Sequence, residues 1–372
     1  MKKLGFGMMR LPLLTGGTDK DIDKEAAKAM IDAFLAAGFT YFDTAYPYHR
    51  GASEKVFGEL VADRYDRSAY TVTDKLPVWL LNEPADCEKI FEKQMERTHA
   101  QYFDWYLLHA LGSQSFAILE KADAFNFMKK LKAEGKIKHI GFSFHGDAAT
   151  LERLLMEHPE MEMVQLQINY ADWDSETVQA RKCYDLCVKY GKPVVVMEPV
   201  KGGALAKVPE KIGAILKEAA PGATPASLAL RFAGTPENVM MVLSGMSNMA
   251  QLKENMAVFD DFEPLSEKEA AAVGEAAEAF NDMVEIKCTA CRYCTEGCPM
   301  NIAIPEHFAN YNAAKLYGYV PSMSNYFTSL CESPARRPPA SAAASARRYA
   351  RSIFPSLKIW RRWMSTFHRS DF

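Results

Sequence analysis

Four polar side chains of different chemistry follow one another along the first third of the chain. They are a carboxylate, a phenol, an ammonium and an imidazole: Asp43, Tyr48, Lys75 and His109. Reducing a carbonyl group requires a proton donor at its oxygen while a hydride arrives at its carbon, and a phenol can donate that proton if a nearby cation lowers its pKa. We therefore expect Tyr48 to act as a general acid whose pKa Lys75 lowers. Asp43 would hold Lys75 in place, and His109 would hydrogen-bond the substrate carbonyl.

A second group of reactive side chains lies near the end of the chain. Residues 288–299 read CTACRYCTEGCP, which gives the spacing C-x₂-C-x₂-C-x₃-C-P of bacterial ferredoxins. The ligands of a [4Fe–4S] cluster would be Cys288, Cys291, Cys294 and Cys298. A zinc site is the alternative, although zinc usually takes two separated C-x₂-C pairs.

The periodicity of apolar residues predicts the fold that brings these four side chains together. Residues 21–39 show helical spacing, an acidic first turn and Gly38 beyond the end, and they predict a helix. Short apolar runs then alternate with helical segments. The predicted strands are residues 4–8, 40–45, 70–75, 105–110, 138–144, 163–170, 193–200 and 240–245.

Eight strands that alternate with helices imply parallel βαβ units and favour a closed (β/α)₈ TIM barrel. A Rossmann fold is the alternative, but no G-x-G-x-x-G follows an early strand. In a TIM barrel the chemistry belongs to polar residues at the carboxyl ends of the strands. Those residues are Asp43, Lys75, His109, Ser143, Gln165, Asn169 and Glu198. Taken singly, each could cap a loop or satisfy the core, but their joint placement at successive strand ends favours a catalytic site.

The order and spacing of Asp43, Tyr48, Lys75 and His109 resemble the tetrad of the aldo-keto reductase superfamily, and the resemblance covers about residues 1–265. It implies a nicotinamide cofactor, NADP(H) or NAD(H), and a small aldehyde or ketone as substrate. A non-enzymatic nicotinamide-binding module that senses redox state is the competing function, and the intact tetrad argues against it.

The resemblance also implies which residues hold the cofactor. Ser143 and Gln165 would bind the nicotinamide carboxamide, with Asn169 nearby. The stretch VLSGMSNMAQLKEN would wrap the adenine end, with Gly245 in this loop and Glu254 and Asn255 at the adenine. The sequence departs from the family pattern in two respects. Gly245 and Gln251 stand where NADPH-preferring members carry cations, and Met197 stands where an aromatic ring usually lies beneath the nicotinamide. The preference between NADPH and NADH therefore stays open.

The chain is expected to divide into three parts. Residues 1–265 form the barrel, residues 266–330 a helical linker and ferredoxin-like segment, and residues 331–372 a low-complexity tail. A subgroup of the superfamily carries such a segment with two cysteine quartets, which would pass electrons to a partner or serve as structure. This chain has one quartet, and in two-cluster ferredoxins the fourth cysteine of a run ligates the other cluster. We therefore expect it to hold a cluster poorly or not at all.

The tail has a composition that cannot build a core, because residues 333–352 contain only Ser, Pro, Ala and Arg apart from Tyr349. A shift of reading frame after about residue 331 would explain it, since codons permitted by the tail can be read out of frame as a second cysteine motif. A disordered tail and a membrane-surface helix in IFPSLKIWRRWM are the alternatives.

Composition excludes several other functions. The 372 residues carry a net charge of −3, but residues 332–372 hold nine Arg and Lys against two Asp and Glu, so the remainder is acidic. An acidic body offers no basic face for nucleic acid. No apolar run approaches the roughly 18 residues of a membrane helix. Four of the eight cysteines lie within residues 288–298 and the other four are scattered, so a disulfide framework is not expected. That fits a reducing compartment, and we expect a cytoplasmic protein.

Overall fold

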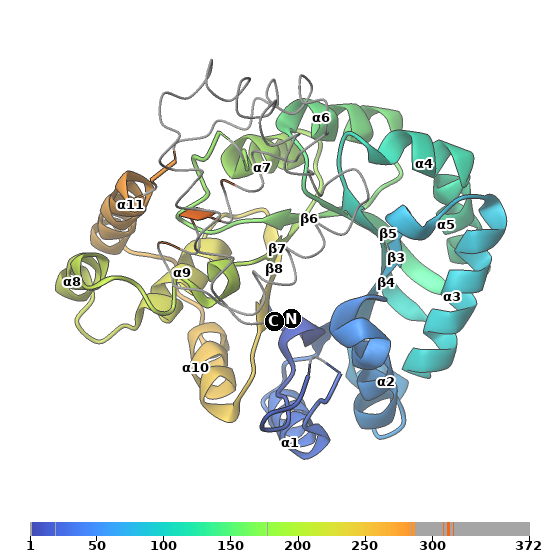
Figure 1. The fold of residues 1–372 in the computed structure, drawn as a ribbon, viewed down its shortest axis with the longest axis horizontal. Coiled ribbons are helices and arrows are strands. Elements are labelled where there is room, and N and C mark those ends of the chain that lie inside the picture. Colours follow the sequence, from blue (N-terminus) through green and yellow to red (C-terminus); the bar gives the residue numbers. More distant parts are fainter. Residues whose placement is uncertain are drawn as a thin grey trace, which may run out of the picture. The chain divides into compact units, whose positions relative to one another are not determined.

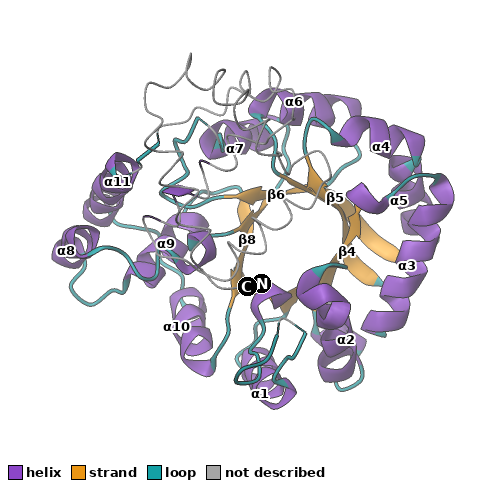
Figure 2. Cartoon of the chain, viewed as in Figure 1, coloured by secondary structure: helices purple, strands orange, loops and turns teal. Residues whose placement is uncertain are grey.

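Eight parallel strands form a closed barrel in the computed structural model, which describes residues 2–18, 20–176, 178–283, 285–286, 308, 311–312 and 315 (Figure 2). The strands are β1 (Leu4–Gly7), β2 (Tyr41–Asp43), β3 (Thr71–Pro77), β4 (Phe103–Leu111), β5 (Ile137–Phe144), β6 (Met163–Gln167), β7 (Val194–Met197) and β8 (Val239–Gly245). They follow chain order around the barrel, and β8 closes it by pairing with β1. The predicted TIM barrel is confirmed, and the Rossmann alternative is wrong.

Helices surround the strands (Figure 1). They are α1 (Lys24–Ala36), α2 (Ala52–Phe57), α3 (Pro84–Thr98), α4 (Ser115–Lys121), α5 (Ala124–Ala133), α6 (Ala148–Glu157), α7 (Ala180–Lys189), α8 (Glu210–Ala219), α9 (Pro225–Gly234), α10 (Met249–Asp260) and α11 (Glu267–Asp282). The predicted first helix is α1. Asp23 caps its first turn by accepting from the N–H of Ala26 at 3.0 Å, and Gly38 beyond its end has a φ of +79°.

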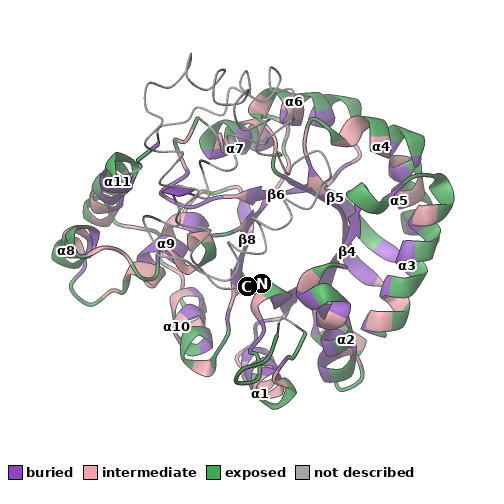
Figure 3. Cartoon of the chain, viewed as in Figure 1, coloured by how far each residue is buried: buried purple, intermediate pink, exposed green. Residues whose placement is uncertain are grey.

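The core has two parts. Figure 3 shows that the strands are largely buried, whereas the helices around them carry many exposed residues. Inside the barrel lies a small cluster made of Tyr41, Leu107, Met163, Val195, Met241 and Leu243. A larger cluster fills the space between strands and helices, with Phe42 and Phe34 among its members. Successive strand residues point to opposite faces, so Tyr41 faces inward while Phe42 packs outward. The three valines of β7 are fully buried, which is why buried parallel strands read as continuous apolar runs.

The chain divides into two compact units, residues 1–277 and residues 278–372. In the second unit, Asn312 makes two hydrogen bonds with the backbone of Ile286, at 2.9 and 2.8 Å. The hydroxyl of Tyr311 donates to Glu285 at 2.9 Å. The predicted boundaries after residues 265 and 330 stay predictions. The cysteine run Cys288, Cys291, Cys294 and Cys298 and the tail 331–372 lie outside the described residues. Among the helices that are described, none is long and apolar enough to cross a membrane.

Candidate active site

The four residues of the predicted tetrad meet at the carboxyl ends of β2, β3 and β4. The ammonium of Lys75 donates to Asp43 Oδ1 at 2.6 Å and to the carbonyl oxygen of Thr44 at 2.8 Å. It also lies 3.3 Å from the hydroxyl of Tyr48. The rings of Tyr48 and His109 face each other edge-on, with centroids 6.0 Å apart. A phenol, an ammonium, a carboxylate and an imidazole therefore share one small volume at the mouth of the barrel.

The loop that carries Tyr48 is held in a defined conformation. Tyr48 begins a short 3-10 turn, Tyr48–Gly51, in which His49 and Arg50 have φ values of 50° and 54°. Residues other than glycine adopt this left-handed region only where their surroundings impose it. The N–H of Leu11 donates to His49 Nε2 at 3.1 Å and ties this loop to the loop after β1. The loop that carries Tyr48 is thus held by its own turn and by its contact with the loop after β1.

The placement of His109 depends on an irregularity in β4. The pairing register between β4 and β5 shifts between Leu108 and Leu111, and Ala110 has a φ of 60°. The N–H of Ala110 donates to Ser143 Oγ at 2.7 Å. Bulges of this kind redirect side chains next to active sites. Here the shift in pairing register lies between Leu108 and Leu111, and His109 is one of the two residues within it.

Burial and charge set the protonation states of the pair Asp43 and Lys75. Lys75 is fully buried, which acts to lower its pKa, but the Asp43 carboxylate and the Tyr48 hydroxyl raise that pKa above its ordinary value. Burial also raises the pKa of Asp43, and the Lys75 ammonium opposes that rise. With the two groups 2.6 Å apart, we treat the pair as an ammonium and a carboxylate.

Lys75 acts to lower the pKa of Tyr48, as expected, but the pKa of Tyr48 is nevertheless raised above its ordinary value. Burial raises the pKa of the Tyr48 hydroxyl, and the Lys75 ammonium acts in the opposite direction without offsetting it. The reason is that the phenol is itself desolvated, which disfavours the tyrosinate. A raised pKa keeps the Tyr48 hydroxyl protonated, which the predicted role of general acid requires.

His109 is a neutral imidazole. Burial lowers its pKa well below the ordinary value, and the Lys75 ammonium and His145 act in the same direction. Its Nδ1 atom is buried without a hydrogen-bond partner among the described residues. The ring of Trp79 lies 5.1 Å from that of His109 and is 49% exposed, so it forms an apolar wall beside the site. Trp173, the other tryptophan near the mouth, instead packs on Phe232 and Tyr184.

The residues predicted for the nicotinamide lie at the ends of β5 and β6. Ser143 is buried, and its hydroxyl accepts the Ala110 bond described above. Gln165 Nε2 lies 3.7 Å from the sulfur of Met197, while Gln165 Oε1 is buried and has no partner in the described part of the chain. Asn169 donates to Asp172 at 2.9 Å and to the carbonyl oxygen of Glu198 at 3.2 Å.

The residues predicted for the adenine end lie in the loop and helix that follow β8. Asn255 is buried and donates to the hydroxyl of Ser244 at 2.9 Å. Glu254 accepts a hydrogen bond from the hydroxyl of Thr224. Gln251 accepts from the N–H of Ser247 at 2.8 Å, so its side chain closes the turn into α10. Gly245 is the last residue of β8.

Sequence reasoning missed part of the polar network at the mouth. The Lys201 ammonium lies 2.6 Å from both carboxylate oxygens of Asp172, and neither residue was predicted to belong to the site. Hydrogen bonds from Gln167 and Asn169 also reach Asp172. Arg10, the last residue of the short 3-10 helix Met8–Arg10 that follows β1, was not predicted to lie near the site, although its charge acts on the Glu198 carboxyl. The only sequence signal for it was a basic residue just after a strand end.

Fold and site together define a TIM-barrel enzyme whose candidate active site lies at the carboxyl ends of the strands. Residues 3–278 match the sequence model of a family that is described as the "Aldo/keto reductase family". The chain belongs to the aldo/keto reductase family.

Individual relatives are distant. A Glycine max protein named a probable aldo-keto reductase is 26% identical over 211 residues, which span 55% of this chain and 57% of that protein. The L-galactose dehydrogenase of Arabidopsis thaliana is 26% identical over 282 residues, which span 70% of this chain and 85% of that protein. An aldo/keto reductase structure from Klebsiella pneumoniae, in complex with NADP and acetate, superposes with a TM-score of 0.60 at 22% identity. That match covers 73% of this chain and 90% of the Klebsiella chain.

Proposed function

We propose that this protein reduces a small aldehyde or ketone to the alcohol with NADPH or NADH, and that Tyr48 is its general acid. The observation that carries the proposal is the buried Lys75 ammonium, which lies 2.6 Å from Asp43 and 3.3 Å from the Tyr48 hydroxyl. Family membership and the relatives named as reductases support the same reaction class.

The proton moves from Tyr48 to the carbonyl oxygen in this proposal. Negative charge then develops on the phenol oxygen, 3.3 Å from the Lys75 ammonium. The ammonium stabilises that charge most in a buried site, where the effective dielectric constant is low. Asp43 keeps Lys75 charged and oriented, and the neutral imidazole of His109 donates a hydrogen bond to the carbonyl oxygen. Trp79 limits the access of water from one side.

The residues at the ends of β5 to β7 fit a nicotinamide. Gln165 Oε1 is a buried acceptor without a donor among the described residues, and a carboxamide NH₂ would satisfy it. The hydroxyl of Ser143 and the sulfur of Met197 lie beside the same strand ends. When bound, the reduced dinucleotide supplies the hydride that reaches the carbonyl carbon. The NADP bound by the Klebsiella relative supports this choice of cofactor.

A panel of aldehydes and ketones assayed with both cofactors tests the proposal. In the Tyr48→Phe variant we expect kcat to fall about 10²- to 10⁴-fold, since only the transferable proton is lost. Binding of NADPH should be unchanged. Tyr65→Phe is the matched control, because Tyr65 donates to Asp32 outside the barrel mouth and should leave kcat unaffected. Tight cofactor binding with no turnover of any carbonyl would contradict the proposal and favour the redox-sensing module.

The cysteine run carries the second part of the proposal. Cys288, Cys291, Cys294 and Cys298 have the ligand spacing of an iron–sulfur cluster. A cluster transfers single electrons, whereas the nicotinamide transfers a hydride, so direct coupling of the two would need an intermediary. We therefore expect the barrel to reduce carbonyls independently of what the cysteines bind.

A further inference from the structure

Glu54 is a buried carboxylate on α2, and each of its oxygens accepts a hydrogen bond. The side chain is fully buried. Its Oε2 atom accepts from the guanidinium of Arg97 at 2.7 Å, and its Oε1 atom accepts from the side-chain amide of Gln94 at 3.1 Å. Both donors belong to α3, and Gln94 is fully buried as well. One carboxylate on α2 thus joins two side chains of α3.

Arg97 contacts the loop that carries Tyr48 on both sides of the phenol. Its guanidinium lies over the ring of Tyr46, 4.6 Å from the ring centroid. It also occupies the place that a side chain at Gly51 would take, because a Cβ there would lie 3.0 to 3.2 Å from the guanidinium atoms. Gly51 has a φ of +87° and ends the short turn that begins at Tyr48. Arg97 therefore packs on this loop both before and after Tyr48.

Gln94 contacts the backbone of Lys75. Its side-chain amide donates to the carbonyl oxygen of Lys75 at 3.1 Å as well as to Glu54. Its Oε1 atom accepts from the hydroxyl of Tyr106 at 2.6 Å, and this bond fixes the orientation of the amide. The strand residue that carries the ammonium is therefore connected to the same carboxylate as the loop that carries the phenol.

Glu54 carries the negative charge of this network. Burial raises the pKa of Glu54, and the hydrogen bonds from Arg97 and Gln94 act in the opposite direction. Asp74, a fully buried carboxyl on β3, has its pKa raised well above the ordinary value by burial and by the charge of Glu54. Since Arg97 keeps its proton at any accessible pH, we treat Glu54 as the carboxylate and Asp74 as the neutral acid.

Resting on the proposed function, we propose that Glu54 is a positioning residue for the contact between the Tyr48 hydroxyl and the Lys75 ammonium. Through Arg97 it holds the loop of the phenol, and through Gln94 it holds the strand of the ammonium. The contact itself is 3.3 Å long. Proton transfer depends on it, because misplacing a reacting group by about 1 Å can cost about 10²-fold in rate. A carboxylate suits this role, since its two oxygens accept from two donors at once.

The variant Glu54→Gln tests the proposal, because the carboxamide keeps the shape of the side chain but offers one acceptor for the two donors. We expect kcat for a carbonyl substrate to fall about 10- to 100-fold. The dissociation constant of NADPH, measured by fluorescence, should change less than about twofold, since the network includes no residue proposed for the cofactor.

Asp104→Asn is the matched control. Asp104 is a buried carboxylate that accepts from the guanidinium of Arg67 at 2.6 Å and from the N–H of Val72 at 2.9 Å. It lies at the amino end of β4, where barrel residues contribute to stability and not to chemistry. Asp104→Asn should therefore leave kcat unchanged. A loss of kcat as large as in Glu54→Gln would overturn the proposal.

A double-mutant cycle separates positioning from general destabilisation. In the Tyr48→Phe background, Glu54→Gln should lower the residual kcat less than about twofold, because the contact that Glu54 positions is already lost. Residual turnover is measured at high protein concentration. Additive losses of kcat would mean that Glu54 supports the barrel in general, and they would contradict the proposal.

Two further changes test each connection separately and do not depend on the folding of Glu54→Gln, which thermal unfolding reports. Arg97→Lys keeps a cation beside Glu54 but loses the planar group on Tyr46, so its kcat should lie between those of wild type and Arg97→Met. Gln94→Met breaks the bond to the Lys75 carbonyl and leaves the ion pair of Glu54 in place. It should lower kcat about 5- to 10-fold. Wild-type kcat in both Arg97→Met and Gln94→Met would overturn the proposal.

The failure of this inference is distinguishable from that of the proposed function. If wild type reduces carbonyls and Tyr48→Phe does not, but Glu54→Gln keeps full kcat, Glu54 is not a positioning residue and the proposed function stands. If wild type reduces no carbonyl with either cofactor, the proposed function fails, and this inference with it.

Discussion

Lys75 is the residue on which both the stability of the mouth and the proposed chemistry depend. Its ammonium is fully buried and hydrogen-bonds both the Asp43 carboxylate and the Thr44 carbonyl. Removing one member of a buried ion pair leaves the other charge without compensation, which costs more than removing both. Stability and catalysis can therefore be separated at this position by comparing single and double variants.

The first prediction uses that difference. In Lys75→Met we expect the free energy of unfolding to fall by about 3 to 5 kcal/mol, because Asp43 is left as an unpaired buried carboxylate. The double variant Lys75→Met with Asp43→Asn should recover much of this loss, yet stay inactive, since the Tyr48 hydroxyl has no cation beside it. Urea unfolding and kcat measure the two effects. Equal stability of the single and double variants would show that the pair is not charged in the folded protein.

The second prediction concerns pH and His109. Its pKa in the folded protein lies well below the value of about 6.5 expected for the unfolded chain. Between these two pKa values the unfolded chain binds a proton that the folded chain does not, so stability falls as the pH is lowered below about 6.5. The slope from this group is at most about 1.4 kcal/mol per pH unit. Replacing His109 with Gln, which does not titrate, should flatten urea-unfolding stability between pH 6.5 and 5.

An unchanged slope in His109→Gln would mean that the imidazole is protonated in the folded protein. That outcome would also remove the neutral hydrogen-bond donor from the proposed mechanism. Activity measured at pH 7 and 9 gives a separate readout, because a neutral His109 should contribute equally at both values.

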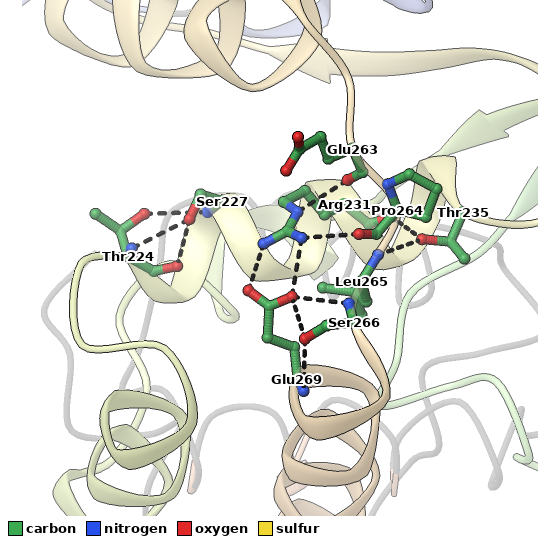
Figure 4. Close-up of polar contacts among 9 residues, drawn as sticks. All are labelled: Thr224, Ser227, Arg231, Thr235, Glu263, Pro264, Leu265, Ser266 and Glu269. Atoms are coloured by element: carbon green, nitrogen blue, oxygen red, sulfur yellow. Dashed lines mark hydrogen bonds and ion pairs between the residues drawn. The ribbon is translucent and has the colours of Figure 1, made fainter.

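At the level of elements, Arg231 joins α9 to α11 through a dense set of contacts (Figure 4). Its guanidinium makes two hydrogen bonds with Glu269, at 2.5 and 2.9 Å, and also donates to the carbonyl oxygens of Glu263 and Pro264. Glu269 further accepts from the N–H and hydroxyl of Ser266, both at 2.8 Å. The bond from Arg231 lowers the pKa of Glu269 to about 2.

The third prediction follows from this pair. A carboxyl with a lowered pKa contributes stability that is complete above its ordinary value of 4.5 and is lost as the pH falls toward about 2. Glu269→Gln should therefore destabilise the protein by about 1 to 2 kcal/mol at pH 7. The difference from wild type should shrink as the pH approaches 2. Glu157→Gln, which breaks an exposed pair with Arg153 on α6, is the control and should cost less than about 0.5 kcal/mol.

The elements themselves were largely predictable, and the contacts between loops were not. Each of the eight strands was predicted from a short apolar run in the sequence, because a strand that is buried on both faces consists mainly of apolar residues. The tetrad was predictable since its members end or follow three of these strands. The ion pair between Lys201 and Asp172 was not predictable, because it joins two loops that are distant in sequence. The net rise of the Tyr48 pKa was also beyond the sequence, since it depends on how deeply the phenol is buried.

At the scale of the whole molecule, the barrel has the attributes of an independent unit. Residues 1–277 form one compact unit, in which eight strands close on themselves with a core inside and outside the sheet. All members of the proposed active site belong to this unit. The cysteine run belongs to the other unit, residues 278–372. Chemistry at the two places should therefore be separable by mutation.

The fourth prediction tests that separation. Anaerobic reconstitution of the full chain with iron and sulfide should load less than about four iron atoms per chain, because one cysteine run supplies ligands for only part of a stable cluster. Cys291→Ser should abolish even this iron, while carbonyl reduction by the barrel stays unchanged. Cys183→Ser, a buried thiol on α7, is the matched control and should leave the iron content as it is. Iron, sulfide and zinc are measured together with kcat. Zinc in place of iron would make the run a zinc site, and loss of reductase activity in Cys291→Ser would show that the barrel depends on the cysteines after all.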